Sequence, residues 1–385
     1  MSSFVATCVR ATFMSLMLFS LSSCGGGIGG TATSASGGTT TMLTSVRHVF
    51  IIVLENKGYA ETFGPASPAP YLAKTLPSMG QLLTQYYGLG HNSLGNYISM
   101  ISGQPLNLIT QTDCQIFQEF LPGVADPTQT NGVLIGQGCI YPTAAKTVVD
   151  QLEAAHFTWK GYMEDLDDGT THTCRHPAVN GLDGTQSAKA TNQYAARHNP
   201  FVYFHGIIDD QARCDAHVVD LAKLDTDLAS LATTPNYVFI TPDLCSDGHD
   251  TPCVDGRPGG LVSINDFLKV VVPKILNSDA YKQDGMLLVT FDEADSAGAE
   301  ANTACCGEPT GPNTPAPGAQ SGGPGGGRTG AVILSPFTQP GSINNTPYNH
   351  YSMLRSVEDI FGLTHLGYAA QNGLAPFGSD VFNAP

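Results

Sequence analysis

The sequence predicts an α/β domain built on a mainly parallel central sheet flanked by helices. Four apolar runs rich in β-branched residues are typical of strands buried on both faces: 46–54, 236–241, 285–291 and 331–335. Patterns of helical period alternate with these strands, most clearly at 144–155, 216–232, 263–272 and 351–361. Alternating strands and helices favour parallel pairing. A chain of 385 residues, of which 42% are hydrophobic, can bury a sizeable core.

The first 24 residues are typical of an export signal. Arg10 is their only charged residue, and the apolar run that follows is too short to span a bilayer. The run ends in Leu-Ser-Ser-Cys, which resembles a lipobox, so we expect Cys24 to be acylated after cleavage. The protein would then be anchored to the bacterial cell envelope, at the outer membrane or in the periplasm. A plain secretory signal, with Cys24 incidental, is the alternative.

The segment that follows has the composition of a linker. Residues 25–45 consist mainly of Gly, Ser, Thr and Ala, which bury too little apolar surface to fold alone. We therefore expect a flexible tether at 25–45 and a single catalytic domain at 46–385.

Eight cysteines remain once Cys8 and Cys24 are set aside, and an even number in an exported chain suggests disulfides. Proximity in the sequence predicts two pairs, Cys114 with Cys139 and Cys174 with Cys214. The other four cysteines allow more than one pairing: Cys245, Cys253, Cys305 and Cys306. A zinc site is the alternative, although the chain has no CxxC pair.

The formal net charge of −16 disfavours nucleic acid as a partner, because nucleic-acid binding depends on contacts between basic side chains and phosphates. Removal of residues 1–24 takes away Arg10 and makes the charge −17. An anionic substrate would need a locally positive site in such a protein. A metal ion is the simplest way to supply one.

Acidic and amide side chains follow two of the predicted strands directly. Glu55 and Asn56 come after the first strand, and Asp292 and Glu293 follow the strand at 285–291. In parallel sheets, ligand sites gather at the carboxyl ends of the strands, and hard oxygen ligands suit a divalent cation. The alternative for Asn56 is that it caps the following helix.

Further candidates lie at helix starts and loops. Ser93 stands where a helix is predicted to begin, a place where backbone N–H groups can bind an anion. A serine there is usually only an N-cap, so a catalytic role requires a metal or base nearby. Asp247 and His249 lie in the loop after 236–241, and His198 and His350 offer imidazole groups. This convergence of oxygen and imidazole groups predicts a metal-assisted esterase.

Seven segments, in the same order, resemble those of the bacterial phosphoesterase family of acid phosphatases and phospholipases C: HVFIIVLEN, HNSLGNYISMISG, HNPFVYF, TPDLCSDGHD, TFDEADS, GGGRTGAVILSP and NHYSMLRSVEDIFGL. The resemblance covers about residues 46–365. That family is similar in fold to alkaline phosphatase, so the resemblance implies an alkaline-phosphatase-like sheet.

The resemblance also implies roles for individual residues. Ser93 matches the nucleophile, and Asn96 matches an amide that contacts the phosphate, although Gly95 replaces the usual proline. The metal cluster corresponds to Glu55, Asn56, Asp292 and Glu293. The active-site histidines correspond to His91, His198 and His350. Asp247 and His249 would belong to a second metal site, but their spacing departs from the Asp-x-x-x-His of alkaline phosphatase relatives, and Asp243 stands where Asn is expected.

These observations predict a metal-dependent phosphomonoesterase in which Ser93 forms a phosphoserine that water then hydrolyses. A divalent metal, of a kind the sequence does not identify, would lower the pKa of Ser93, and His198 or His350 would protonate the leaving group. A phospholipase C-type diesterase is the first alternative. We favour the monoesterase because the phospholipase branch typically carries additional carboxyl-terminal domains, whereas here the family match ends near Gly367 and only about eighteen residues follow. A non-catalytic surface lipoprotein of the same fold is the second alternative.

Overall fold

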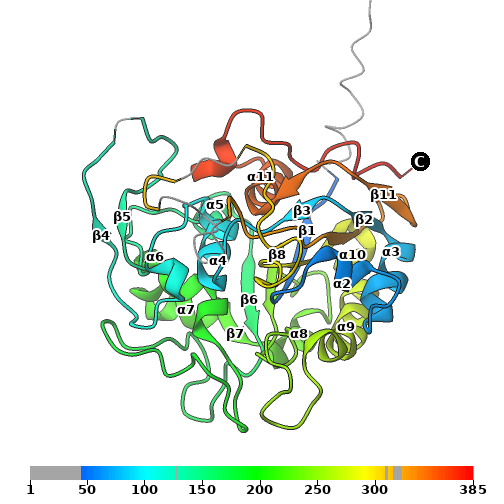
Figure 1. Cartoon of the computed structure of the whole chain (residues 1–385), viewed down its shortest axis with the longest axis horizontal. Coiled ribbons are helices and arrows are strands. Elements are labelled where there is room, and N and C mark those ends of the chain that lie inside the picture. The colour runs from blue at the N-terminus through cyan, green and yellow to red at the C-terminus, as the bar shows by residue number, and fades with distance from the viewer. Residues whose placement is uncertain (1–44, 127, 308–310, 315–322, 385) are drawn as a thin grey trace, which may run out of the picture. The chain divides into compact units, whose positions relative to one another are not determined.

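The computed structural model describes residues 45–126, 128–307, 311–314 and 323–384 (Figure 1). The predicted signal, Cys24 and the tether up to residue 44 lie outside the described residues. In the part of the chain that the structure describes, no helix has the length and apolar character needed to cross a bilayer.

An eight-stranded sheet forms the centre of the domain, and its strands lie in the order β11-β2-β10-β9-β1-β8-β6-β7. In chain order they are β1 (His48–Leu54), β2 (Gln81–Leu83), β6 (Trp159–Met163), β7 (Val218–Asp220), β8 (Tyr237–Thr241), β9 (Gly285–Phe291), β10 (Ala331–Leu334) and β11 (Ser342–Asn344). Strands β9, β1, β8, β6 and β7 pair in parallel, whereas β10 is antiparallel to both of its neighbours. The predicted mainly parallel α/β sheet is therefore confirmed.

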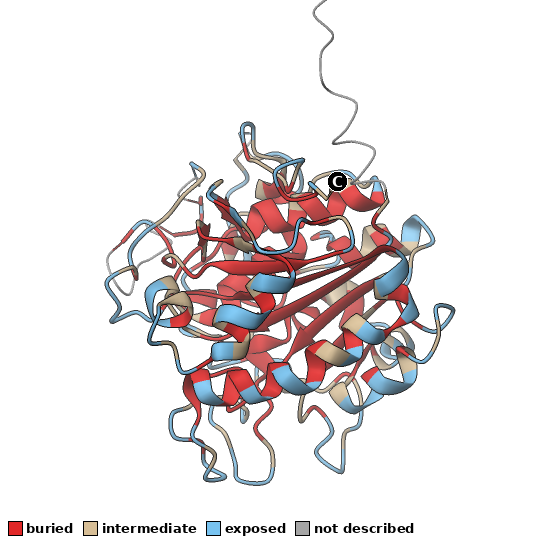
Figure 2. Ribbon diagram, turned by 90° about the vertical axis from the view of Figure 1, so that its right-hand side faces the viewer, coloured by how far each residue is buried: buried red, intermediate tan, exposed pale blue. Residues whose placement is uncertain are grey.

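Strand β1 supplies side chains to both faces of the sheet, as its nearly continuous apolar run predicts. Val49, Ile51 and Val53 belong to one core cluster, and Phe50 and Ile52 belong to the other. Each side chain of this kind stabilises the fold by about 1.5–3 kcal/mol when it is fully buried. The central strands β1, β8 and β9 are buried along their length, and helices at the surface expose one face (Figure 2).

Helices cover both faces of the sheet. One core cluster includes side chains from α4 (Ser93–Ser102), α5 (Val148–Ala154) and α11 (His350–Phe361). The other packs against α9 (Gly260–Asn277), α3 (Leu76–Met79) and α10 (Asp279–Asp284). The remaining short elements are α2 (Tyr59–Phe63), α6 (His205–Ile208), α7 (Gln211–His217), α8 (Leu224–Asp227), β3 (Tyr86–Tyr87), β4 (Leu121–Pro122), β5 (Gly136–Gln137) and β12 (Tyr348–Asn349).

Three of the four predicted helices are present, but the prediction of a single helix at 216–232 is wrong. Helix α7 ends at His217, and the two β-branched residues Val218 and Val219 join the edge of the sheet as β7. The Asp220 side chain then accepts a hydrogen bond from the Ala222 N–H and starts a short 3₁₀ turn. Pairing with β6 thus outweighs the helical periodicity of this segment.

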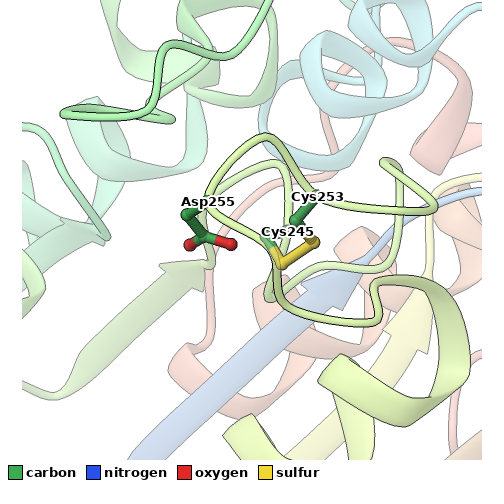
Figure 3. A group of neighbouring side chains, drawn as sticks. All are labelled: Cys245, Cys253 and Asp255. Atoms are coloured by element: carbon green, nitrogen blue, oxygen red, sulfur yellow. A yellow bond between two sulfur atoms is a disulfide. The ribbon is translucent and has the colours of Figure 1, made fainter.

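The eight cysteines that follow Cys24 form four disulfides. The predicted pairs Cys114–Cys139 and Cys174–Cys214 are confirmed. The pairings that the sequence left open are Cys245–Cys253 and Cys305–Cys306. Cys245 and Cys253 lie beside Asp255, but their sulfur atoms are bonded to each other and are not thiolate ligands (Figure 3). The zinc alternative therefore finds no support in the described residues.

Candidate active site

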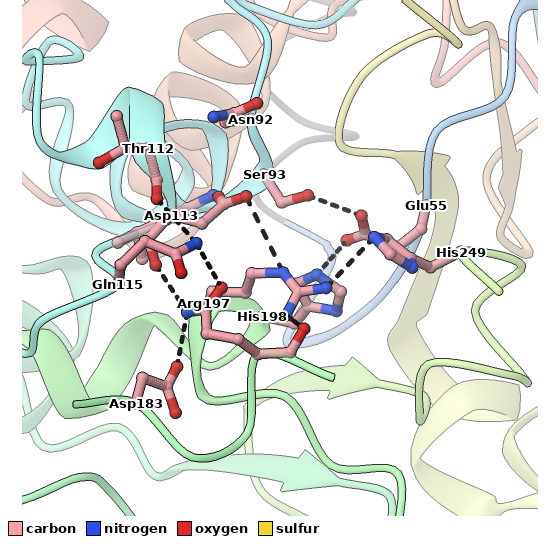
Figure 4. A network of polar contacts seen from close by, with 12 residues as sticks. Glu55, Asn92, Ser93, Thr112, Asp113, Gln115, Asp183, Arg197, His198 and His249 are labelled. Carbon is pink, nitrogen blue, oxygen red and sulfur yellow. Dashed lines mark hydrogen bonds and ion pairs between the residues drawn. The ribbon is translucent and has the colours of Figure 1, made fainter. Parts of the chain in front are cut away.

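The candidate site is centred on Glu55, the first residue after β1, whose side chain is fully buried. Its Oε2 accepts hydrogen bonds from Ser93 Oγ at 2.8 Å and from Asn56 Nδ2 at 3.1 Å. Its Oε1 accepts one from the Tyr97 hydroxyl at 2.6 Å and lies 3.4 Å from His198 Nε2. The structure thus brings together four residues predicted for the site, and the Ser93 and His198 contacts with Glu55 are drawn in Figure 4.

Ser93 is the first residue of α4, and the N-cap of this helix is Asn92. Asn92 has a φ of 75°, a strained conformation for a residue other than glycine, and its side chain donates a hydrogen bond to the Gln111 carbonyl. The interpretation of Ser93 as a simple N-cap is therefore wrong. Its hydroxyl lies at the positive end of a ten-residue helix, where an anion is stabilised.

Asn96 stabilises the loop that leads into Ser93. Its Oδ1 accepts hydrogen bonds from the Leu89 and Gly90 N–H groups, at 2.9 and 3.2 Å, and its Nδ2 donates to the Gly90 carbonyl at 2.8 Å. Nδ2 also lies 3.3 Å from Glu293 Oε2. In this arrangement the amide serves the loop, and contact with a phosphate stays a prediction.

Asp292 lies beside Glu55 because β9 pairs in parallel with β1 and places Phe291 opposite Leu54. Asp292 Oδ1 accepts a hydrogen bond from the Asn56 N–H at 3.1 Å, whereas its buried Oδ2 has no hydrogen-bond partner. Asn56 has a φ of 57° and does not cap α2, whose N-cap is Gly58. The capping alternative for Asn56 is therefore wrong.

His350 contacts the backbone of Asp292 and not its carboxyl group. Its Nε2 lies 2.6 Å from the Asp292 carbonyl oxygen, and its Nδ1 lies 3.1 Å from the Tyr86 hydroxyl. Burial lowers the pKa of His350 to about 4, so the ring is neutral, with one nitrogen donating and the other accepting. Both nitrogens are thus occupied, and the expectation that His350 protonates a leaving group does not fit its position.

His91 and His198 lie closer to the carboxylate cluster. His91 Nε2 is 2.6 Å from the Ala301 carbonyl oxygen, and its Nδ1 is 3.5 Å from Glu293 Oε2. His198 Nδ1 is 3.1 Å from Asp247 Oδ2. Glu55, His198 and Asp247 each place one potential ligand atom within 4.8 Å of the others. These three residues are therefore close enough to share a cation.

His249 does not join this group. Its Nδ1 lies 2.8 Å from Asp250 Oδ1, and its Nε2 lies 3.2 Å from Arg197 Nη2. Neither ring nitrogen is left for a metal in this arrangement, so the predicted ligand role of His249 does not fit. The His249 backbone N–H donates to Asp247 Oδ1 at 2.8 Å, but the His249 ring contacts Asp250 while Asp247 Oδ2 contacts His198.

A pocket of about 230 Å³ lies beside Ser93. Its lining residues are Asn56, Asn92, Ser93, Asp113, His249, Glu293, Asp295 and Ser296. Asp113 was not predicted for the site, and its Oδ1 accepts a hydrogen bond from the Leu94 N–H at 3.0 Å. The buried Arg197, also not predicted, places Nε 4.0 Å from Asp113 Oδ2 (Figure 4). Arg197 precedes His198 directly, and that adjacency was the only signal for it in the sequence.

The carboxyl groups of the site are held in an unfavourable environment. Burial, with the neighbouring carboxylates, raises the pKa values of Glu55 and Glu293 well above their ordinary range. Burial also raises the pKa of Asp247 and brings that of Asp292 to about 6. Burial, with nearby Arg197, lowers the pKa of His198. The contacts of His198 with Glu55 and Asp247 are therefore those of a neutral ring and not salt bridges.

These residues fit a divalent cation. The donor set is rich in carboxylate and amide oxygens, which hard cations prefer. Two buried atoms, Asp292 Oδ2 and His198 Nε2, have no hydrogen-bond partner and lie within this acidic cluster. A cation held by Glu55, Asn56 and Asp292 would offset the charge that burial otherwise disfavours.

Comparison with known proteins identifies a family. A model of the Phosphoesterase family matches residues 69–364. A probable acid phosphatase of Kluyveromyces lactis is 24% identical over 321 residues, which cover 83% of this chain and 59% of that protein. A phosphatidylinositol-3-phosphatase of Mycobacterium tuberculosis is 23% identical over 333 residues, which cover 85% of this chain and 81% of that protein. The chain thus spans less than two thirds of the length of the yeast relative.

Among solved structures, a protein of the alkaline phosphatase superfamily from Vibrio parahaemolyticus aligns with 83% of this chain and 67% of its own, at 10% identity and a TM-score of 0.42. A phosphonate monoester hydrolase from Silicibacter pomeroyi aligns with 88% of this chain and 77% of its own, at 10% identity and a TM-score of 0.46. At this level of similarity the family assignment depends on the sequence match.

The raised carboxyl pKa values predict how the stability of the cation-free protein depends on pH. Above about pH 5 these groups are ionised in the unfolded chain, whereas in the folded protein they retain protons to higher pH. The folded state therefore binds more protons, and stability falls as pH rises. His198 and His350 act in the opposite direction, but only below about pH 6.5, where histidine titrates in the unfolded chain. Between about pH 7 and about pH 9 we expect the Tm in EDTA to fall.

Differential scanning calorimetry with EDTA and with Mg²⁺ measures this effect. Mg²⁺ should raise the Tm most at the alkaline end, and Glu55→Gln should flatten the pH dependence in EDTA. Burial raises the pKa of Glu358 to about 9, so this residue contributes to the pH dependence with or without Mg²⁺. A Tm in EDTA that rises over this range would contradict the account.

Proposed function

Because the chain belongs to the Phosphoesterase family, we propose that it is a hydrolase of phosphate esters, and more narrowly a metal-dependent phosphomonoesterase that uses Ser93 as its nucleophile. The observation that carries the proposal is the hydrogen bond of 2.8 Å from Ser93 Oγ to the buried carboxyl of Glu55, at the start of α4 and beside a pocket. A serine that served only the helix would not need a buried carboxyl as its partner.

The reaction divides into two displacements at phosphorus. Ser93 Oγ forms a bond to phosphorus, and the bond from phosphorus to the leaving oxygen breaks. The Ser93 hydroxyl already donates its hydrogen bond to Glu55 Oε2, which can accept its proton. A divalent cation held by Glu55, Asn56, Asp292 and Glu293 would supply positive charge that lowers the pKa of the serine hydroxyl and balances the phosphoryl oxygens. Water then hydrolyses the phosphoserine and regenerates the hydroxyl.

The leaving oxygen needs a proton from a group on the pocket side. His198 and His350 do not line the pocket, whereas Asp113 and His249 do. Burial raises the pKa of Asp113, which favours its protonated form. Both ring nitrogens of His249 are occupied by Asp250 and Arg197, so we assign the proton to Asp113 and not to the two histidines that the sequence favoured.

Phosphate monoesters are the substrates that the pocket and the relatives support best. The pocket of about 230 Å³ is small, and polar residues line it. The names of the relatives, a probable acid phosphatase and a phosphatidylinositol-3-phosphatase, describe phosphatases. A phospholipase C-type diesterase is the second candidate, because the family resemblance includes it.

The proposal includes location and domain organisation. Four disulfides favour an oxidising compartment outside the cytoplasm. We infer that residues 1–24 form a lipoprotein signal, that Cys24 carries the lipid, that 25–45 is a tether and that 46–385 is one catalytic domain. The disulfides support export from the cytoplasm. The signal, the lipid anchor and the domain bounds are further parts of the proposal.

Replacement of the nucleophile tests the mechanism. In Ser93→Ala, hydrolysis of p-nitrophenyl phosphate should fall by about 10³-fold or more, because the substitution removes the hydroxyl that donates to Glu55 Oε2. Circular dichroism should show a folded protein. Ser102→Ala is the matched control, since Ser102 lies on the same helix and its hydroxyl donates to the Ile98 carbonyl, away from Glu55. Turnover by folded Ser93→Ala at the wild-type rate would exclude Ser93 as nucleophile.

Substrate preference separates the two phosphoesterase candidates. The kcat/KM for p-nitrophenyl phosphate should exceed that for bis-p-nitrophenyl phosphate and for phosphatidylcholine, because the small polar pocket accepts a monoester more readily than a second ester group. The three values are measured with the same preparation and the same cation. Faster hydrolysis of either diester would reverse the assignment in favour of the phospholipase C type.

Acylation predicts a defined change in fractionation. Cys24→Ala should move the protein from the membrane fraction to the soluble fraction or block its processing, because a lipoprotein is held by several acyl chains. Immunoblots of both fractions, with mass spectrometry of the mature N-terminus, measure this. A wild-type protein found entirely in the soluble fraction would show that Cys24 carries no anchor.

A further inference from the structure

Tyr97 lies one helical turn after Ser93 on α4, so the two side chains share a face of the helix. Both donate hydrogen bonds to the same carboxyl group. Ser93 Oγ bonds to Glu55 Oε2 at 2.8 Å, and the Tyr97 hydroxyl bonds to Glu55 Oε1 at 2.6 Å. Tyr97 is fully buried, so its hydroxyl has no access to solvent.

The two oxygens of Glu55 therefore have different surroundings. Oε1 faces Tyr97 and His198, whereas Oε2 faces Ser93 and Asn56, which both line the pocket. A carboxyl group with no partner on Oε1 would be free to rotate and to exchange its two oxygens. The phenol hydroxyl removes this freedom by holding Oε1 on the inner side.

Packing fixes the phenol itself. The Tyr97 ring stacks on the imidazole of His198, with centroids 5.3 Å apart and an angle of 14° between the planes. The Tyr97 ring also meets the ring of Phe239, a residue of β8, in an edge-to-face contact with the centroids 6.3 Å apart. Tyr97 thus connects the helix that carries Ser93, the 3₁₀ turn that carries His198 and the end of β1 that carries Glu55.

We propose that Tyr97 is a positioning residue that holds Glu55 Oε1, so that Oε2 faces Ser93 and the cation. This inference rests on the proposed function, because it assumes that Glu55 is a ligand. Outer partners that orient a ligand typically change metal affinity by about 10- to 100-fold when they are removed. A hydroxyl that merely satisfied a buried carboxyl would affect stability and leave cation affinity unchanged.

The chain offers a matched control in Tyr162. Its hydroxyl also donates to a carboxyl oxygen, Asp227 Oδ2, at 2.6 Å, and its ring belongs to the core on the other face of the sheet. Tyr162→Phe and Tyr97→Phe therefore remove the same atom from the same kind of hydrogen bond. Only Tyr97 is bonded to the candidate site.

Isothermal titration calorimetry, in which Mn²⁺ is added to the protein after EDTA treatment, measures the affinity for Mn²⁺ directly. For Tyr97→Phe we expect the Kd for Mn²⁺ to weaken by about 10- to 100-fold. For Tyr162→Phe the Kd should equal that of the wild type. Hydrolysis of p-nitrophenyl phosphate provides a second readout, in which the rate of Tyr97→Phe should recover toward the wild-type rate as Mn²⁺ is raised.

The outcomes separate this inference from the proposed function. Wild-type protein that binds no Mn²⁺ would overturn the metal part of the proposed function and this inference with it. Binding by the wild type and an unchanged Kd in folded Tyr97→Phe would overturn this inference alone. Equal weakening in Tyr162→Phe would show a general loss of stability and would also overturn it. If Tyr97→Phe unfolds in buffer, the same titrations in sucrose, which stabilises folded states, decide the matter.

Discussion

The parallel pairing of β1 with β9 places two carboxylates side by side at one edge of the sheet. Leu54 pairs with Phe291, so the residues that follow, Glu55 and Asp292, leave the sheet at the same level. The backbone continues this contact, because the Asp292 N–H donates to the Leu54 carbonyl at 2.9 Å. A shift of one residue in this register would turn one of the two side chains toward the opposite face of the sheet. The rest of the site, including the position of Ser93 over Glu55, depends on this pairing.

Concentrating acidic groups in a buried place opposes stability. Glu55, Asp292 and Glu293 all have raised pKa values, and burial is the main cause for each. Hydrogen bonds from Ser93, Tyr97 and Asn56 offset part of this penalty without removing it. Such a cluster is what a cation-dependent site requires, since the same charges that destabilise the empty cluster bind a cation.

The sequence predicted the parts of the fold that follow from local patterns. Runs such as 285–291 are apolar on both faces, and the observed β9 has the same bounds. Strand β6 was missed because WKGYM is short and includes a partly exposed lysine, so its place in the sheet depends on pairing with β8. Strand ends likewise predicted the neighbouring carboxylates at Glu55 and Asp292. The partners of His249 and His350 were not predictable, because distant residues decide which way an imidazole ring faces. Tyr97 could have been found from its spacing of four residues after Ser93.

Anomalous scattering can locate a cation bound beside Ser93. Crystals of the Ser93→Ala protein and of the wild type, grown in EDTA and then soaked in Mn²⁺, would give anomalous difference maps. We expect one strong peak within bonding distance of Glu55 Oε2 and Asp292 Oδ2 in the wild type, beside Ser93 Oγ. Peaks confined to other carboxylates of this acidic protein, with none at Glu55, would contradict it.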